Sequence, residues 1–417
     1  MDNMFEKNKE YKKKLLFAKT QKRDRIHSFH RYFGKLIPAI PKFAIEEFTS
    51  PDDLVCDITC GSGTSLVEAK LAGRNSYGID INPLAVLISK VKITQIDENA
   101  LEQGKQRLML DVKQDKGKNI SKDIPFCINM DHWFKPFVQR DLVVLKRNID
   151  VIEEKDLKDF FTICFSAFLK SVSNADPRHI FPGYSKRMHK EDENGRKINV
   201  MEAFEKLVDS RIKYLTNFSA VASPEVFSKA LLADARSIPK KIKNVNLIIT
   251  NPPYISSIRY LETIKLEMFW LEYLSNPEGY HNLDKTLIGT ERFSTQEIQQ
   301  YMNNGIKDVD LITEKLFIND QKKMSRVVRD YFVDMENIFE GMNRILDKDG
   351  RIVIKISDSH VRGFTIPTHQ VFAEIASNNG LELEASFKDQ IMSRSLMTKR
   401  NTYSGMLSYD WIMVFKK

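Results

Sequence analysis

The sequence has no long hydrophobic run and few cysteines, and each absence excludes a class of protein. No stretch of about 18 apolar residues occurs, so a transmembrane helix is not expected. The first residues carry charge without an apolar core, which argues against a secretory signal. The four cysteines are too few for a disulfide framework, and none forms a Cys-x-x-Cys pair with zinc spacing. These absences predict a cytoplasmic protein with no metal site and no membrane partner.

Internal repeats and low-complexity segments are also absent. Hydrophobic residues make up 42% of the chain and charged residues 29%, which is ordinary for a protein that buries a core. The length of 417 residues suits one large α/β domain with an insertion, or two modest domains.

The net charge of +8 is concentrated near the N-terminus. Residues 1–43 hold twelve Lys or Arg against four Asp or Glu, so the rest of the chain is nearly neutral. A basic arm over residues 1–25 suits contact with a phosphate backbone, where counterion release drives binding without regard to sequence. It is equally consistent with a solvated terminus that keeps the protein soluble.

The order of the expected elements predicts a doubly wound, mostly parallel sheet. Two strand–turn–helix units in series, beginning at 54–59 and 76–81, are typical of parallel strands with helices on both faces. Helical periodicity then dominates residues 95–228, which we interpret as a helical insertion and a candidate target-recognition region. Further strands are expected at 230–235, 246–254, 351–357, 381–391 and 408–417, the last two as a C-terminal β-hairpin. The prediction is an α/β catalytic domain of about seven strands over 26–94 and 229–417.

The segment DITCGSGT (57–64) has the residues of a ligand-binding turn. Gly61 and Gly63 allow a tight turn after a strand, and the following helix N-terminus offers amide donors. Position 66 is leucine where a dinucleotide-binding loop has its third glycine, which favours a smaller adenosyl ligand. Asp80 ends the next strand, where a carboxylate can accept hydrogen bonds from ribose hydroxyls.

The tetrapeptide Asn251-Pro252-Pro253-Tyr254 directly follows an apolar strand. Prolines have no amide hydrogen, so the neighbouring carbonyls are not used in a strand ladder. The Asn251 side-chain oxygen and the Pro252 carbonyl can therefore accept hydrogen bonds from one NH2 group, and Tyr254 offers a ring for stacking on a planar base. Two acceptors on an exocyclic amine would favour sp3 character and direct its lone pair toward a methyl donor.

Together, DITCGSGT, GIDINP and TNPPY resemble the motifs of the S-adenosylmethionine-dependent DNA amino-methyltransferases. Residues 30–45 are also similar to the segment that covers the methionine part of the cofactor in that family. The similarity runs over residues 26–92, 230–275 and, more loosely, 331–417. The NPPY motif also occurs in RNA base methyltransferases and in enzymes that methylate protein glutamine, and the cytosine-N4 enzymes more often have serine in place of Asn251.

The resemblance implies a role for each matching residue. The methionine end of S-adenosyl-L-methionine would lie among the residues of the first motif, which are Asp57, Thr59, Cys60, Gly61, Ser62, Gly63 and Thr64. Asp80 and Ile81 would bind the ribose, and Asp234 and Ala235 would lie beside the adenine ring. Lys35 and Pro38 would belong to the lid. Asn251, Pro252, Pro253 and Tyr254 would hold the target base.

The sequence therefore predicts an enzyme that methylates double-stranded DNA, with adenine N6 as its target. A cytosine-N4 or RNA base methyltransferase, and a DNA-specificity subunit without turnover, remain alternatives. Contact with the phosphate backbone is expected from Arg394, Lys399 and Arg400. Sequence recognition would fall to the helical insertion, to residues 276–325, or to both, and a cognate restriction enzyme is a candidate partner.

Overall fold

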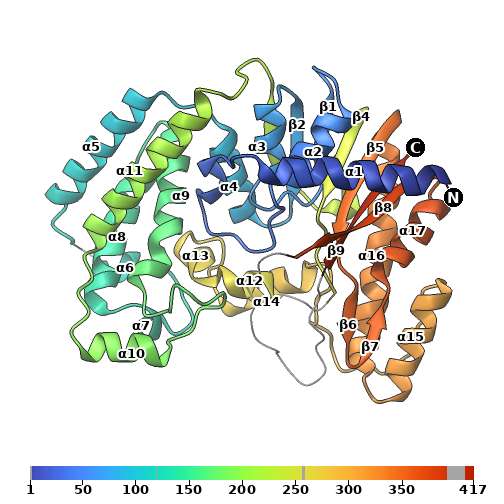
Figure 1. Cartoon of the computed structure of the whole chain (residues 1–417). Helices are drawn as coiled ribbons and strands as arrows, with labels where there is room; N and C mark the ends of the chain where they lie inside the picture. Colours follow the sequence, from blue (N-terminus) through green and yellow to red (C-terminus); the bar gives the residue numbers. More distant parts are fainter. Residues whose placement is uncertain (1, 119, 256–258, 392–408) are drawn as a thin grey trace.

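The computed structural model describes residues 2–118, 120–255, 259–391 and 409–417. Its centre is a seven-stranded sheet in the order β3-β2-β1-β4-β5-β9-β8 (Figure 1). The strands are β1 (Leu54–Asp57), β2 (Asn75–Asp80), β3 (Ser228–Leu232), β4 (Val245–Thr250), β5 (Leu346–Ile356), β8 (Glu382–Gln390) and β9 (Tyr409–Lys416). Strands β1 to β5 run parallel, and β9 is antiparallel to both β5 and β8. The predicted fold and its C-terminal hairpin are confirmed.

The chain reverses its winding direction between β1 and β4. From β1 it moves outward to β2 and β3, and it returns through β4 to β5 on the other side. Ligands of doubly wound sheets bind at such a switch point, beyond the carboxyl ends of the strands. The helices after β1 and β2 are α3 (Thr64–Leu71) and α4 (Pro83–Ile93). Asn82 caps α4 by accepting a hydrogen bond from the amide of Leu84, and Pro83 suits the first helical turn.

Helices cover both faces of the sheet (Figure 1). On one face, α1 (Asp2–Thr20) and α2 (Ala39–Phe48) pack against residues such as Leu247, Val353 and Val414. On the other, α16 (Lys322–Ile345), α17 (Thr368–Asn378) and α15 (Lys307–Ile318) bury the alternate residues, including Ile248 and Ile352. This alternation follows from the two-residue period of a strand.

Helix α1 is part of the body of the protein. Its buried side chains Tyr11, Leu15 and Ala18 belong to the core on the α2 face of the sheet. Lys7 pairs with Glu384 at 2.5 Å and Lys19 pairs with Asp389, so two of its cations are bound to β8. Fewer cations of the expected basic arm are therefore available to a phosphate backbone than its composition indicates.

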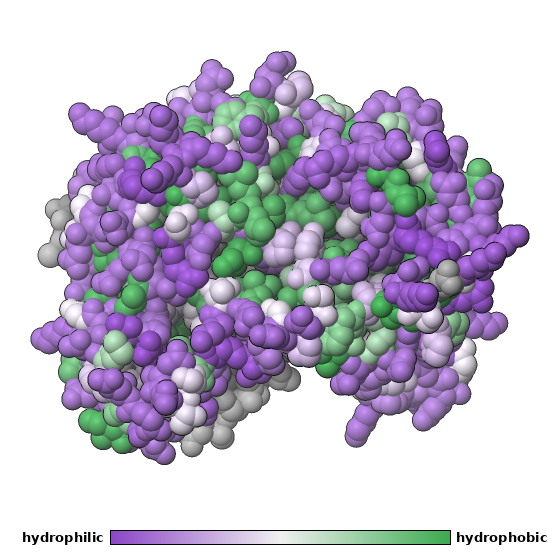
Figure 2. Space-filling view, turned by 180° about the vertical axis from the view of Figure 1, so that it is seen from behind, coloured by the Kyte–Doolittle hydropathy of each residue, from purple (hydrophilic) through white to green (hydrophobic). Residues whose placement is uncertain are grey.

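Residues 95–228 contain the helices α5 (Glu98–Gln114), α6 (Ile120–Asp123), α7 (Met130–Trp133), α8 (Pro136–Asp150), α9 (Lys155–Val172), α10 (Lys186–Glu193) and α11 (Val200–Ser219). All of them except α10 contribute to a second core, which they share with α3 and α4. The longer ones stand to one side of the sheet in Figure 1. From the opposite side, hydrophobic residues gather in the hollowed middle of the molecule, between two hydrophilic flanks (Figure 2).

The remaining described elements are short. They are the 3-10 turns η1 (Arg25–Ser28) and η2 (Ala235–Ser237), helices α12 (Tyr260–Thr263), α13 (Lys265–Trp270) and α14 (Pro277–Thr286), and the hairpin of β6 (Ser359–Val361) and β7 (Phe364–Ile366). The hairpin was not expected, because its strands are only three residues long. Strand β5 begins before the expected strand at 351–357, and its pairing with β4 passes from Leu346 to Arg351 and skips residues 347–350.

Within the described part of the chain, no helix is both long and apolar enough to cross a membrane. The same residues contain no cluster of three or more His, Cys, Asp or Glu side chains suited to a metal ion.

Candidate active site

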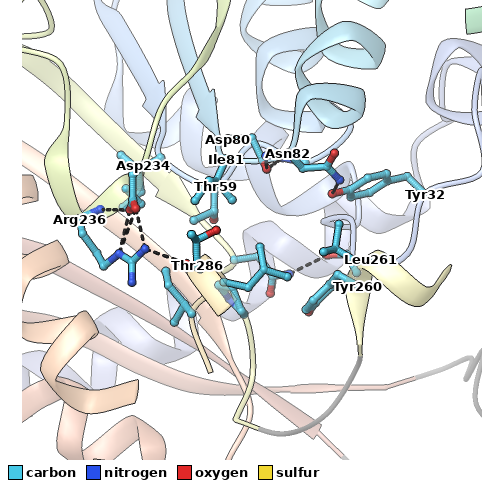
Figure 3. Close-up of a pocket in the computed structure, with 18 of the residues that line it drawn as sticks. Tyr32, Thr59, Asp80, Ile81, Asn82, Asp234, Arg236, Tyr260, Leu261 and Thr286 are labelled. Carbon is cyan, nitrogen blue, oxygen red and sulfur yellow. Dashed lines mark hydrogen bonds and ion pairs between the residues drawn. The ribbon is translucent and has the colours of Figure 1, made fainter. Parts of the chain in front are cut away.

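A pocket opens beyond the carboxyl ends of β1, β2, β3 and β4, at the switch point of the sheet (Figure 3). The predicted site residues that line it are Thr59, Gly61, Asp80, Ile81, Asp234, Ala235, Asn251 and Pro253. Side chains far apart in the sequence complete the wall, among them Tyr32, Asn82, Arg236 and Tyr260. Residues from three separate motifs therefore meet in one cavity.

Asp80 is held at the pocket wall by backbone donors. Its carboxylate accepts hydrogen bonds from the amide of Gly61 at 2.8 Å and from the amide of Asn82 at 2.9 Å. Burial raises the pKa of Asp80 to about 6, although these amides oppose the shift. An ionised carboxylate has about four acceptor sites, so acceptor capacity remains for a ligand in the pocket.

The glycine-rich loop brings its backbone close to its neighbours. A Cβ on Gly61 would lie 3.1 Å from the ring of Tyr32, and Gly63 has a left-handed φ of +73°. The hydroxyls of Ser62 and Thr64 are buried and have no hydrogen-bond partner among the described residues. Ser62, Gly63, Thr64 and Cys60 do not line the pocket in this structure, although they lie directly beside Gly61. The orphaned hydroxyls are candidate donors to a ligand that reaches this loop.

Asp57 lies behind the pocket wall. Its carboxylate accepts hydrogen bonds from the hydroxyl of Ser65 at 2.6 Å and the amide of Thr59 at 3.1 Å. Burial raises its pKa to about 7. Asp57 therefore holds the shape of the loop in this structure and does not face the cavity.

Asp234 is paired with a neighbour that the sequence did not single out. Arg236 lies 2.6 Å from its carboxylate, and Arg236 also donates to the Thr286 carbonyl at 2.7 Å, as Figure 3 shows. The ion pair contributes to a low pKa for Asp234, although partial burial opposes this. The chain after β3 is thereby joined to the end of α14.

The segment before α2 closes the pocket from the other side. Lys35 donates to the His27 carbonyl at 2.8 Å, and Pro38 precedes α2, so both support this segment without lining the cavity. The carbonyl of Gly34 accepts a hydrogen bond from the side-chain nitrogen of Asn251 at 2.8 Å. Gly34 has a φ of +75°, and a Cβ there would lie 2.9 Å from Tyr260.

Tyr254 is joined to charged groups on the neighbouring strands. Its hydroxyl donates to the Asn251 side-chain oxygen at 3.2 Å and accepts from the Lys355 ammonium at 2.7 Å. Lys355 pairs with Asp410 at 2.8 Å. Sequence reasoning missed Lys355 and Asp410, because they lie 101 and 156 residues from Tyr254 and no local pattern marks them. Tyr254 and the buried Pro252 do not line the pocket.

Arg394, Lys399 and Arg400, the expected phosphate contacts, lie outside the described residues. All four cysteines are buried and free.

The pocket suits an adenosyl ligand that carries charge. Ile58, Ile81 and Ile288 offer apolar surface for a planar ring, and Asp80 offers acceptors for hydroxyl groups. The buried hydroxyls of Ser62 and Thr64 lack partners, as expected of groups that a ligand satisfies. Fold and pocket together are those of an S-adenosylmethionine-dependent methyltransferase.

Comparison with known proteins narrows this class. A family model described as DNA methylase matches residues 2–91. The chain is 26% identical over 424 residues to the type II methyltransferase M.MvaI of Kocuria varians, covering 96% of this chain and 92% of that protein. It is 23% identical over 452 residues to the type II methyltransferase M.MjaII of Methanocaldococcus jannaschii, covering 84% of this chain and 81% of that protein. A TehB-like SAM-dependent methyltransferase structure from Corynebacterium glutamicum matches at 10% identity and a TM-score of 0.30, covering 90% of this chain and 87% of that one.

Over nearly its whole length the chain is thus similar to type II DNA methyltransferases, and its N-terminal part matches a model of the DNA amino-methyltransferases, which include both adenine-N6 and cytosine-N4 enzymes.

Proposed function

We propose that this protein transfers a methyl group to the N6 amine of adenine at a specific site in double-stranded DNA. The observation that carries the proposal is Asn251-Pro252-Pro253-Tyr254 at the carboxyl end of β4, with Asn251 lining the same pocket as Asp80. The pocket thus joins a candidate site for a ribose to a candidate acceptor for an amine.

Asp80 and Ile81 are proposed to hold the ribose of the cofactor, with Asp234 and Ala235 beside its adenine ring. The glycine loop from Thr59 to Thr64 would take the methionine end, Asp57 would maintain the shape of that loop, and Lys35 and Pro38 would support the segment that covers it. When bound, S-adenosyl-L-methionine supplies an electrophilic methyl group. Two local features support these positions, namely the free acceptor capacity of Asp80 and the orphaned hydroxyls of Ser62 and Thr64.

Asn251 is proposed to act on the amine. Its side-chain oxygen and the Pro252 carbonyl would accept the two amine hydrogens, which frees the nitrogen lone pair from the ring. Acceptors held in place before the reaction would stabilise the charge that develops on nitrogen without reorganising. No enzyme nucleophile is required, in agreement with the burial of all four cysteines. Pro253 would keep the loop rigid, and Tyr254 would contact the target base.

The assignment to adenine rests on Asn251, because cytosine-N4 enzymes more often have serine at this position. A direct test is to incubate the protein with labelled cofactor and unmethylated duplex DNA, digest the DNA, and separate its nucleosides by mass spectrometry. N6-methyladenine is the expected product. N4-methylcytosine would overturn the choice of base, and label found only in RNA or protein would overturn the DNA substrate.

Sequence recognition is proposed to involve the helices between residues 95 and 228, because they pack against α3 and α4, the helices that follow β1 and β2. A partner endonuclease that cleaves the same unmodified site is a further part of this proposal. Cleavage of unmethylated host DNA, but not of DNA treated with this protein, by a neighbouring gene product would support it.

A further inference from the structure

We propose that Lys355 is a positioning residue for methyl transfer, which sets the orientation of the Asn251 amide through the hydroxyl of Tyr254. The inference rests on the proposed function, because it assigns a purpose to the orientation of Asn251. It adds a residue on β5, outside the sequence motifs, to the machinery of the site.

The three groups form one chain of contacts. Lys355 lies near the carboxyl end of β5, and its ammonium is 2.7 Å from the Tyr254 hydroxyl oxygen. The same nitrogen is 5.3 Å from the centre of the Tyr254 ring, so it approaches the hydroxyl end of the side chain and not the ring face. The Tyr254 hydroxyl is in turn 3.2 Å from the Asn251 side-chain oxygen.

The direction of each hydrogen bond follows from the chemistry of its donor. An ammonium group can only donate, so Tyr254 must accept from Lys355 and direct its own proton elsewhere. The Asn251 oxygen at 3.2 Å is nearer than the Asp410 oxygen at 3.5 Å, which is at the limit for a hydrogen bond.

The other end of the Asn251 amide is also fixed. Its nitrogen donates to the Gly34 carbonyl at 2.8 Å. A flipped amide would place its oxygen against that carbonyl and its nitrogen against the Tyr254 hydroxyl. The observed orientation keeps the acceptor oxygen on the Tyr254 side, with a second lone pair left for an amine hydrogen.

Asp410 keeps the ammonium charged in a buried place. The Lys355 side chain is 12% exposed and that of Asp410 is 9% exposed. Burial opposes the charge on Lys355, but Tyr254 and Asp410 outweigh it and raise its pKa. Ser357 donates a further hydrogen bond to Asp410. An uncharged lysine could accept a hydrogen bond from the Tyr254 hydroxyl, which would then no longer donate to the Asn251 oxygen, so the charge matters to the orientation.

A purely structural ion pair would give the same contacts, so the test needs a matched control. Arg351 is on the same strand and, four residues earlier, on the same face of the sheet. It pairs with Glu384 on β8 at 2.6 Å, and it does not line the pocket. Arg351→Met therefore removes an ion pair from β5 without touching Tyr254.

The experiment compares wild type with Lys355→Met, Lys355→Arg, Tyr254→Phe, the double variant Lys355→Met/Tyr254→Phe, and Arg351→Met. We expect Lys355→Met to lower kcat about tenfold while cofactor Kd stays within twofold. Lys355→Arg, which keeps a charged donor, should recover part of that loss. The double variant should be no slower than Tyr254→Phe alone, because Lys355 acts through the Tyr254 hydroxyl. If Lys355→Met does not fold, the double variant Lys355→Met/Asp410→Asn replaces it in the comparison, because it removes both charges of the buried pair.

An unchanged kcat in Lys355→Met, multiplicative losses in the double variant, or an equal fall in Arg351→Met would each overturn the proposal. Crystal structures of wild type and Lys355→Met give a readout that needs no DNA activity. We expect the Asn251 side chain to keep its two partners in wild type and to turn away in the variant. If the wild-type protein methylates no DNA but the Asn251 side chain still turns away in Lys355→Met, the proposed function fails and the positioning role of Lys355 stands. An Asn251 that does not move contradicts the positioning role whatever the substrate.

Discussion

The two sides of the pocket are built by different kinds of contact. On the side of β1 and β2, Asp80 is held by amides that lie within twenty residues of it, in the turns after the two strands. On the side of β4, Asn251 is held by Gly34, which is 217 residues away, and Tyr254 is held by Lys355 and Asp410. One side is preorganised by its local backbone, and the other depends on side chains brought together by the whole fold.

Because of this difference, we expect cofactor binding and the rate of methyl transfer to respond to different substitutions. Backbone donors in tight turns persist wherever the local conformation persists, so the Asp80 side should tolerate changes elsewhere in the protein. The Asn251 side should be sensitive to distant substitutions, because each of its partners is on a different element. Variants on the two sides should therefore affect different measurements.

The largest expected effect comes from Asn251→Ala. Loss of an acceptor that acts in the transition state should cost on the order of 3 kcal/mol, or a hundredfold or more in rate. Cofactor affinity should change by only a few fold, because Asp80 is on the other side of the pocket. Single-turnover kinetics with labelled cofactor, together with calorimetric titration, measure both quantities. A variant that retains activity would remove Asn251 from the mechanism.

Asp80→Ala should show the opposite pattern. Removal of a charged acceptor from buried hydroxyls costs about 1.5–3 kcal/mol, which is at least tenfold in Kd for S-adenosylmethionine. The rate at saturating cofactor should fall much less than in Asn251→Ala. Unchanged affinity in calorimetry would mean that the ribose is bound elsewhere.

Cofactor affinity should also fall as the solution becomes more acidic. Burial raises the pKa of Asp80 to about 6, so its carboxylate gains a proton and loses acceptor capacity as the pH drops below that value. Kd measured by calorimetry should therefore rise between pH 7 and pH 5. Asp80→Asn should remove this dependence, and any dependence that remains would point to Asp57, whose pKa burial raises to about 7.

Gly34→Ala tests the long-range side with a smaller change. Its φ of +75° strains any other residue, and its Cβ would lie 2.9 Å from Tyr260. Displacement of the Gly34 carbonyl should loosen Asn251 and lower kcat about fivefold, with cofactor Kd nearly constant. Gly380→Ala is the matched control, because Gly380 has the same φ of +75° and no atom within 4 Å of its Cβ position. An equal loss of activity in both variants would assign the effect to stability alone.

The same contrast explains what the sequence could predict. The seven strands and the motifs at their ends were predictable, because hydrophobic runs and turn residues act over a few positions. Asn82 was within reach of that reasoning, since it follows Asp80 closely and caps α4. Lys355 and Asp410 carry no local signal, and only the fold brings them to the motif. The packing of α1 was missed because, among its side chains from residue 4 on, only Tyr11, Leu15 and Ala18 are buried, and many charged residues surround them in the sequence.

The smallest expected effect concerns the exposed lysines of α1. Deleting this helix would remove buried residues and test stability instead of charge, so we suggest replacing the exposed Lys9, Lys12 and Lys13 with glutamine. If these side chains bind phosphates, affinity should fall equally for all DNA sequences, because phosphate contacts position a protein without specifying a site. The plot of log affinity against log salt should flatten by about 0.9 for each phosphate of duplex DNA that the variant no longer neutralises.

We expect this flattening, and its matched control is Lys7→Gln, because Lys7 is already paired with Glu384. Fluorescence anisotropy with a specific and an unrelated duplex, over a range of salt concentrations, measures both the slope and its dependence on sequence. A triple variant with the wild-type slope would mean that the N-terminal surplus of charge serves solubility. If the triple variant loses affinity only for the specific duplex, α1 would instead belong to the elements that recognise the DNA sequence, together with the helices between 95 and 228.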